Sequence, residues 1–128
     1  MKKYSALIID LINSRSYVDS DRVDIQKYLI KVIASLNKVF EDGLELDVVF
    51  SGGDEVQGLF SSPQAAYLYV RLFDMLVSPV GIRAGIGVGE WNVQIDDAMS
   101  TEQDGTAYHN ARYAIEHVED ALGYRMLV

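Results

Sequence analysis

Apolar residues in this chain recur with two spacings, one typical of strands and one typical of helices. Short apolar and β-branched runs occupy residues 4–10, 45–51, 55–60 and 80–89, and they have the length and composition of strands. Between these runs lie segments whose apolar residues are three and four positions apart, as on one face of a helix. The pattern therefore predicts strands and helices that alternate along the chain.

Three segments carry the helical spacing. The first begins at Ser20, which can cap it, and ends at Asp42-Gly43. The second begins at Ser62-Pro63, a serine cap followed by proline, and stops at Ser78-Pro79. The third covers residues 105–122. The residues expected to face the core are Ile25, Leu29, Val32, Leu36 and Val39, then Ala65, Leu68, Tyr69, Leu72, Phe73 and Leu76, then Ala107, Ala111, Ala114, Ile115 and Val118.

The predicted elements follow the order βαββαβ, with an added helix and the start of a strand at residues 124–128. This order with a central hairpin is typical of the ferredoxin-like plan. We therefore expect one α/β (α+β) domain over residues 1–128, an antiparallel sheet with helices on one face plus the added C-terminal helix. Alternating glycines in residues 81–89 predict that another segment packs close to that strand.

The predicted hairpin carries two glycines and two carboxylates at its bend, in residues 51–56. Glycine permits positive φ and lets a ligand approach the backbone, and carboxylates are ligands of hard divalent cations. The first strand ends in Asp10, so Asp10 and Asp54 can share one site if that strand lies beside the hairpin. Two facing carboxylates repel each other, and a bound cation would keep both ionised.

The same residues also have ordinary structural interpretations. Glycine-glycine-aspartate is a common hairpin turn. Glu55 can be a solvated strand residue, Arg15 a surface cation, and Arg112 the partner in a structural salt bridge.

Composition narrows the class of protein. The 128 residues are 49% hydrophobic, which suits one folded domain, and they include no cysteine, which excludes disulfides and fits a reducing cytoplasm. A net charge of −8 without a basic stripe disfavours direct binding of duplex nucleic acid. No apolar run is long enough to cross a membrane and no signal peptide is evident, so we expect a cytoplasmic protein without a membrane partner.

Four motifs resemble the SatD family in order and spacing. They occupy residues 10–15, 53–58, 82–89 and 104–112, and the resemblance covers nearly the whole chain. Many members of that family are longer, which leaves open whether the protein continues past Val128.

The motifs are also similar to the palm domain of nucleotidyl cyclases. Asp10 resembles the aspartate on the first metal-binding strand of class III cyclases, and Asp54 their second metal-binding aspartate. Residues 52–56 match the GGDEF signature of diguanylate cyclases, except that valine replaces the phenylalanine. Arg112 falls where class III cyclases carry a transition-state arginine. Tyr108 stands where they carry an asparagine, with Asn110 nearby but out of register.

The resemblance implies specific roles. It implies Mg²⁺ or Mn²⁺ held by Asp10 and Asp54, with Glu55 and the Leu11 carbonyl as further ligands. Asp10, Asp54 and Arg112 would be the catalytic residues. The residues expected to bind the nucleotide are Asn13, Ser14, Arg15, Gly52 and Gly53. Phosphoryl transfer depends mainly on positioning and electrostatics, so no nucleophilic serine or cysteine is required.

We therefore expect binding of a nucleoside triphosphate, with nucleotidyl cyclase- or nucleotidyltransferase-like activity that yields a cyclic nucleotide signal. Such palms usually complete their site across a dimer, so we also expect a homodimer, with the apolar surface of the second helix as one candidate contact. One alternative is a catalytically inactive nucleotide-binding regulatory module that acts through a protein partner. Another is a structural interaction domain in which the acidic pair only forms a turn. The adenine-selecting lysine of many adenylyl cyclases aligns near Val48, so no base preference carries over.

Overall fold

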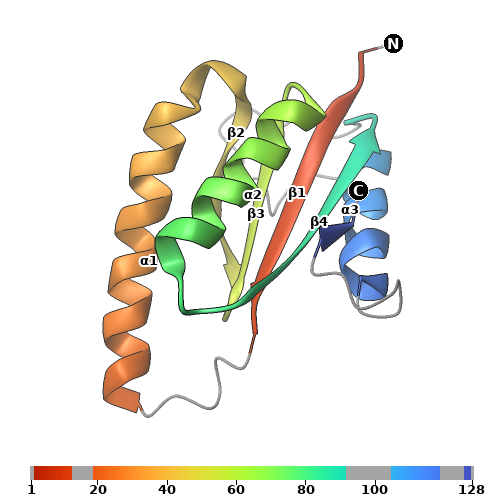
Figure 1. Ribbon diagram of the computed structural model, residues 1–128. Coiled ribbons are helices and arrows are strands. Elements are labelled where there is room, and N and C mark those ends of the chain that lie inside the picture. Colours follow the sequence, from red (N-terminus) through yellow and green to blue (C-terminus); the bar gives the residue numbers. More distant parts are fainter. Residues whose placement is uncertain (1, 13–18, 92–104, 119–125, 128) are drawn as a thin grey trace.

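The computed structural model describes residues 2–12, 19–91, 105–118 and 126–127. It confirms the predicted order of strands and helices, with one further strand at the C-terminal end (Figure 1). None of the helices in these ranges is long and apolar enough to span a membrane. The elements are β1 (Tyr4–Leu11), α1 (Asp19–Val39), a 3₁₀ turn η2 (Glu41–Gly43), β2 (Leu44–Gly52), β3 (Glu55–Phe60), α2 (Pro63–Val77), β4 (Ile82–Gly89), α3 (Thr106–His117) and β5 (Met126–Leu127).

The five strands form one sheet in the order β2-β3-β1-β4-β5. Strand β1 is central and pairs antiparallel with both β3 and β4, whereas β5 pairs parallel with β4. β3 is inserted between β1 and β2, which is the split βαβ arrangement of ferredoxin-like domains. β1 is deeply buried, and its residues 6–9 are at most 1% exposed.

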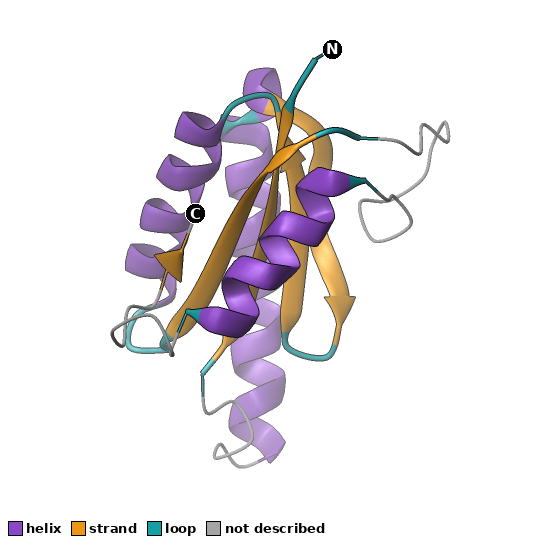
Figure 2. Ribbon diagram, turned by 90° about the vertical axis from the view of Figure 1, so that its right-hand side faces the viewer, coloured by secondary structure: helices purple, strands orange, loops and turns teal. Residues whose placement is uncertain are grey.

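Helices cover both faces of the sheet. α1 and α2 lie on one face, as expected, and the added helix α3 lies on the other (Figures 1 and 2). Successive residues of a strand point to opposite faces. Accordingly, Leu7 and Ile9 of β1 join the core under α1 and α2, whereas Ala6 and Ile8 join the core under α3.

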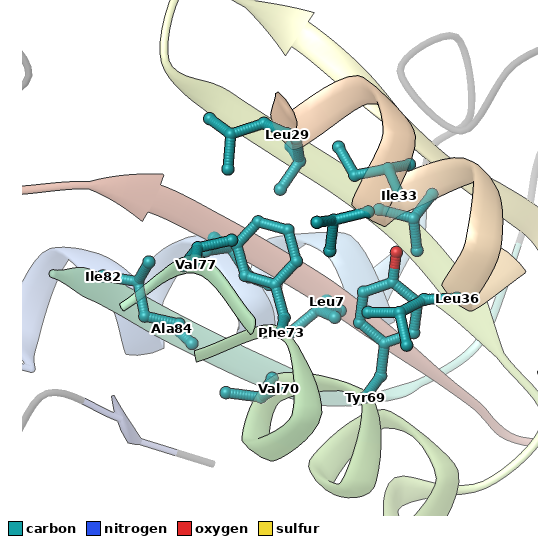
Figure 3. Close-up of a cluster of buried hydrophobic side chains, with 14 of the residues drawn as sticks. Leu7, Leu29, Ile33, Leu36, Tyr69, Val70, Phe73, Val77, Ile82 and Ala84 are labelled. Carbon is teal, nitrogen blue, oxygen red and sulfur yellow. The ribbon is translucent and has the colours of Figure 1, made fainter. Parts of the chain in front are cut away.

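The larger core is built around two aromatic side chains of α2. Tyr69 and Phe73 stack with their ring centroids 6.3 Å apart, and Phe60 of β3 meets Tyr69 edge-on at 5.4 Å. Leu29 and Ile33 of α1 close this cluster (Figure 3). Burial of aromatic and branched side chains in this cluster is the main force that holds α1 and α2 on the sheet.

The buried stripe of α2 differs from the one expected. The cap is as predicted, since the Ala65 N–H donates to Ser62 Oγ over 3.2 Å. However, Leu68, Leu72 and Leu76 are 54%, 37% and 45% exposed. The buried residues are Ala66, Tyr69, Val70, Phe73 and Val77. α2 is apolar on most of its circumference, so its apolar residues fit two overlapping helical stripes. Tyr69 and Phe73 belong to both stripes, and their packing determines which stripe is buried.

The ends of the helices also differ in detail from the prediction. α1 begins at Asp19, so Ser20, the predicted start, lies one residue inside the helix. It ends at Val39, which is 71% exposed and not in the core as expected. The Asp42-Gly43 pair lies in the 3₁₀ turn that follows. All five residues expected to face the core from the third helix are buried, whereas its predicted end at residue 122 falls outside the described residues.

Helix α3 lies directly on β4 because glycines leave no side chains between them. Gly85, Gly87 and Gly89 all face α3. A Cβ atom at Gly85 would come within 2.5 Å of the Ala111 carbonyl oxygen and 2.6 Å of the Ile115 nitrogen. The predicted close packing against this strand is thus confirmed, and α3 is the segment that packs there.

Replacing Gly85 with alanine should lower the free energy of unfolding by about 1–3 kcal/mol, because the new methyl group meets backbone atoms of α3. Val88→Ala is the matched control on the same strand, since Val88 is 39% exposed, and it should cost about 0.5 kcal/mol or less. Urea unfolding of both variants measures the difference. Equal stabilities would show that α3 is not held against β4 in this way.

Candidate functional site

The residues predicted to form a site converge at one end of the sheet. β1 ends there with Asp10, the β2–β3 hairpin turns there through Gly53-Asp54, and β4 begins there (Figure 2, lower end of the sheet). The Cα atom of Asp10 lies opposite Glu55 of β3 on one side and Arg83 of β4 on the other. Directly opposed residues share a face of the sheet. These three side chains therefore lie together on the face that α3 covers.

The hairpin turn is fixed to the end of β1 through the backbone. Gly53 has φ of +53°, a left-handed conformation that favours glycine. The Leu11 N–H donates to the Asp54 carbonyl over 3.1 Å, and the Ile12 N–H donates to the Gly81 carbonyl over 2.8 Å. Asp54 consequently lies beside the end of β1, which is the placement expected from the sequence.

Asp10 forms a two-point ion pair with Arg83. The Arg83 Nε donates to Asp10 Oδ1 over 3.1 Å, and Nη2 donates to Oδ2 over 3.3 Å. Both side chains are about one-third exposed, at 29% for Asp10 and 31% for Arg83. Arg83 has no assigned role in the prediction from sequence. The sequence marks Arg83 only as a single charge within an otherwise apolar strand, which does not identify Asp10 as its ion-pair partner.

Glu55 forms a second two-point ion pair, with Arg112 of α3. Arg112 Nη1 donates to Glu55 Oε1 over 2.6 Å, and Nη2 donates to Oε2 over 3.0 Å. Ser51 Oγ and Gln57 Nε2 also donate to Oε2, at 2.8 and 3.2 Å. Glu55 is therefore not the freely solvated strand residue considered above. The salt-bridge interpretation of Arg112 is confirmed, and its catalytic role stays a prediction.

The two ion pairs make a self-compensated cluster of charges. The Arg112 hydrogen bond holds the pKa of Glu55 below its ordinary value of 4.5, against the opposing effect of burial. The pairing with Glu55 raises the pKa of Arg112, with further contributions from the charges of Glu116 and Asp10. The sequence predicts a bound cation because the carboxylates of Asp10 and Asp54 would otherwise repel each other. In this structure Arg83 and Arg112 already supply the positive charge.

The donor chemistry of the site fits a divalent cation. Asp10, Asp54 and Glu55 offer the carboxylate oxygens that Mg²⁺ and Mn²⁺ prefer. Within the described ranges, no group of three or more histidine, aspartate or glutamate side chains is arranged to hold a metal. Since the carboxylates of Asp10 and Glu55 contact guanidinium groups, metal binding there requires these contacts to be exchanged.

The structure describes only some of the other predicted site residues. Asn13, Ser14 and Arg15, expected to bind the nucleotide, lie outside the described residues. Gly52 ends β2 and Gly53 lies in the turn, both beside Asp54.

At the position of the cyclase asparagine, α3 offers no amide to the site. Tyr108 is only 7% exposed, and burial raises the pKa of its phenol. Its hydroxyl has no hydrogen-bond partner in the described part of the chain. The Asn110 Nδ2 donates to the Val88 carbonyl over 2.9 Å, which holds this amide at β4.

Arg112→Gln should raise the pKa of Glu55, because it removes the group that chiefly lowers it. The pKa of Glu55 is lower in the folded than in the unfolded chain, so its pairing stabilises the fold above the unfolded value. That stability is lost as pH falls below 4.5 through the folded value. Carbon NMR titration of the Glu55 carboxyl measures the shift, with Arg71→Gln on exposed α2 surface as the control. An identical Glu55 pKa in both variants would contradict the assigned cause.

Comparison with solved structures shows a shared fold with nucleotidyl cyclase domains. The guanylyl cyclase domain of the RhoGC fusion protein from Blastocladiella emersonii matches with a TM-score of 0.65 and 15% identity, over 90% of this chain and 73% of that chain. The guanylate cyclase domain of RhGC from Catenaria anguillulae, in complex with GTP, matches with a TM-score of 0.67 and 14% identity, over 90% and 72%. A microbial GGDEF domain matches with a TM-score of 0.61 and 18% identity, over 98% and 76%.

The predicted palm fold is therefore confirmed. A search of curated protein sequences found no match. The model of the SatD family, in contrast, matches residues 4–126, which is nearly the whole chain. This protein belongs to the SatD family.

Proposed function

We propose that this protein binds a nucleoside triphosphate together with Mg²⁺ or Mn²⁺ and carries out nucleotidyl cyclase- or nucleotidyltransferase-like chemistry that yields a cyclic nucleotide. The observation that carries the proposal is the convergence of Asp10, Asp54, Glu55 and Arg112 at one end of a palm-type sheet. Carboxylates for metal and guanidinium groups for phosphate are the two requirements of phosphoryl transfer.

The charged residues at this end of the sheet have separate chemical roles in the proposed reaction. Asp10 and Asp54 hold the metal, with Glu55 and the Leu11 carbonyl as further oxygen donors. The bound metal would polarise phosphoryl oxygens and lower the pKa of a coordinated hydroxyl. The Arg112 guanidinium stabilises negative charge that develops on the phosphate oxygens, since its planar fork matches their geometry.

The structural neighbours support a nucleotide as the class of ligand. The Catenaria anguillulae domain was solved with GTP, and the microbial GGDEF domain interacts with cyclic di-GMP. Val48, at the position near the adenine-selecting lysine of many adenylyl cyclases, is 1% exposed and offers no group to a base. Incubation with each nucleoside triphosphate identifies the base that the protein prefers.

A second candidate function is a regulatory module that binds nucleotide and metal without turnover. Tyr108 favours it, because a buried phenol cannot replace the amide of the cyclase asparagine. The pairing of Arg112 with Glu55 of the same chain also favours the regulatory module, because a paired Arg112 does not bind a substrate. Such a module would act through a protein partner.

We also propose a homodimer, with a contact that differs from the one expected. α2 lies on the face of the sheet opposite to Asp10, Glu55 and Arg112, so its apolar surface cannot complete their site. A dimer that shares the site has to use the face that carries α3. The guanylyl cyclase domain of the RhoGC fusion protein has been solved both as a dimer and as a monomer.

Incubation with each labelled nucleoside triphosphate and Mn²⁺ or Mg²⁺ should give a new cyclic product, resolved by chromatography. Asp54→Ala should reduce the product at least about 100-fold, because it removes a metal ligand. Asp74→Ala on α2 is a matched control and should leave the yield unchanged. Unchanged triphosphate in every reaction, with metal-dependent nucleotide binding retained, would favour the regulatory module instead.

A charge on the α3 side should disrupt the dimer. Tyr113 is 64% exposed on α3, so Tyr113→Glu should shift sedimentation toward the monomer, because a buried charge costs free energy. Leu72→Glu, on the exposed side of α2, should leave the dimer intact. A protein that sediments as a monomer with and without nucleotide would refute the shared site.

A further inference from the structure

Arginine side chains neutralise two of the three carboxylates at the end of the sheet that carries the proposed site. Arg83 and Arg112 balance the negative charges of Asp10 and Glu55, and Asp54 contributes a third negative charge. Each paired carboxylate meets its guanidinium through two hydrogen bonds, at distances between 2.6 and 3.3 Å. The two pairings reduce the negative charge available to a free divalent cation, which binds through ionised carboxylate oxygens.

We propose that Arg83 and Arg112 act as internal counter-ions that keep free divalent cations from the site and admit a cation only together with a polyphosphate. The inference rests on the proposed function, because it concerns the same carboxylates. It adds a specificity that the fold alone does not imply. The ligand recognised is the metal–polyphosphate complex, and neither the metal nor the phosphate chain alone replaces all the contacts in the cluster.

Electrostatics favours the combined ligand. A free cation that approaches Asp10 or Glu55 is repelled by the adjacent guanidinium, and it has to displace that guanidinium from its two-point pairing with the carboxylate. A polyphosphate offers the displaced guanidinium an equivalent contact, since its oxygens accept two parallel hydrogen bonds from a guanidinium as a carboxylate does. The carboxylates can then turn to the metal while Arg83 and Arg112 turn to the phosphates.

The exchange of ion-pair partners in the cluster requires only side-chain movements. The backbone of α3 lies directly against the glycines of β4. The exchange needs no movement of this helix, because Arg112 can leave Glu55 by rotating its side chain, which is 41% exposed. Glu55 keeps its hydrogen bonds from Ser51 and Gln57 when Arg112 moves away. The site thus stays assembled while its charges change partners.

Binding of free Mn²⁺, measured by the electron paramagnetic resonance signal of the unbound ion, tests the inference. Arg83→Gln and Arg112→Gln should each bind Mn²⁺ about 3- to 10-fold more tightly than the unmodified protein, because each uncovers a carboxylate. Tripolyphosphate should increase the Mn²⁺ affinity of the unmodified protein and have a smaller effect on both variants. Arg71→Gln removes the same charge from α2 and should change neither value.

Two further controls concern the position of the bound ion and the folding of the variants. Adding Asp54→Ala to either arginine variant should abolish the gain in Mn²⁺ affinity, which places the Mn²⁺ at this site. Circular dichroism confirms that each variant is folded, and either arginine variant alone suffices if the other does not fold.

The outcomes separate the two proposals. Mn²⁺ affinities of both arginine variants at or below that of the unmodified protein would overturn the counter-ion inference, even if the unmodified protein binds Mn²⁺ with tripolyphosphate. Absence of Mn²⁺ binding in every protein, with and without tripolyphosphate, would overturn the proposed function as well.

Discussion

The direct contact between α3 and β4 is the constraint on which the site depends. Three glycines on the inner side of β4 let the helix backbone lie against the strand backbone. Arg112, in the second half of α3, therefore reaches across β1 to Glu55 on β3, where the two side chains meet at 2.6 Å. A side chain on β4 at any of these positions would push the helix outward and lengthen that distance. The packing of a helix thus sets the electrostatics of a site formed mainly by strands.

The central position of β1 has a comparable effect within the sheet. Because β1 pairs with β3 and β4, one residue at its end, Asp10, faces both Glu55 and Arg83. The result is a row of three charged side chains across the strands, with Asp10 between Glu55 and Arg83. Arg112 of α3 pairs with Glu55 at one end of this row. Exposed and half-exposed ion pairs contribute little to folding, and a cluster of ionic groups with perturbed pKa values is a candidate for a functional site. A guanylate cyclase domain that shares this fold was solved in complex with GTP, and this protein is a member of the SatD family.

Local patterns predicted the strands, the hairpin turn and the acidic residues at its bend, because turn chemistry and alternation depend on neighbouring residues. Two features depended on distant contacts and were missed. The pairing of Arg83 with Asp10 joins residues 73 positions apart, and only the register of β1 and β4 brings them together. The buried face of α2 was misassigned because Leu68 and Leu72 fit a helical stripe as well as Val70 does. Packing around Tyr69 and Phe73 decides the rotation of that helix.

Calorimetric titration with a nonhydrolysable nucleoside triphosphate, with Mn²⁺ and then with EDTA, shows whether this end of the sheet binds a nucleotide through a metal. We expect binding with Mn²⁺ that is lost in EDTA and lost in Asp54→Ala, while Asp74→Ala binds normally. Binding that survives in EDTA and in Asp54→Ala would place the nucleotide elsewhere. Complete absence of binding would contradict the assignment of this end of the sheet as a nucleotide site.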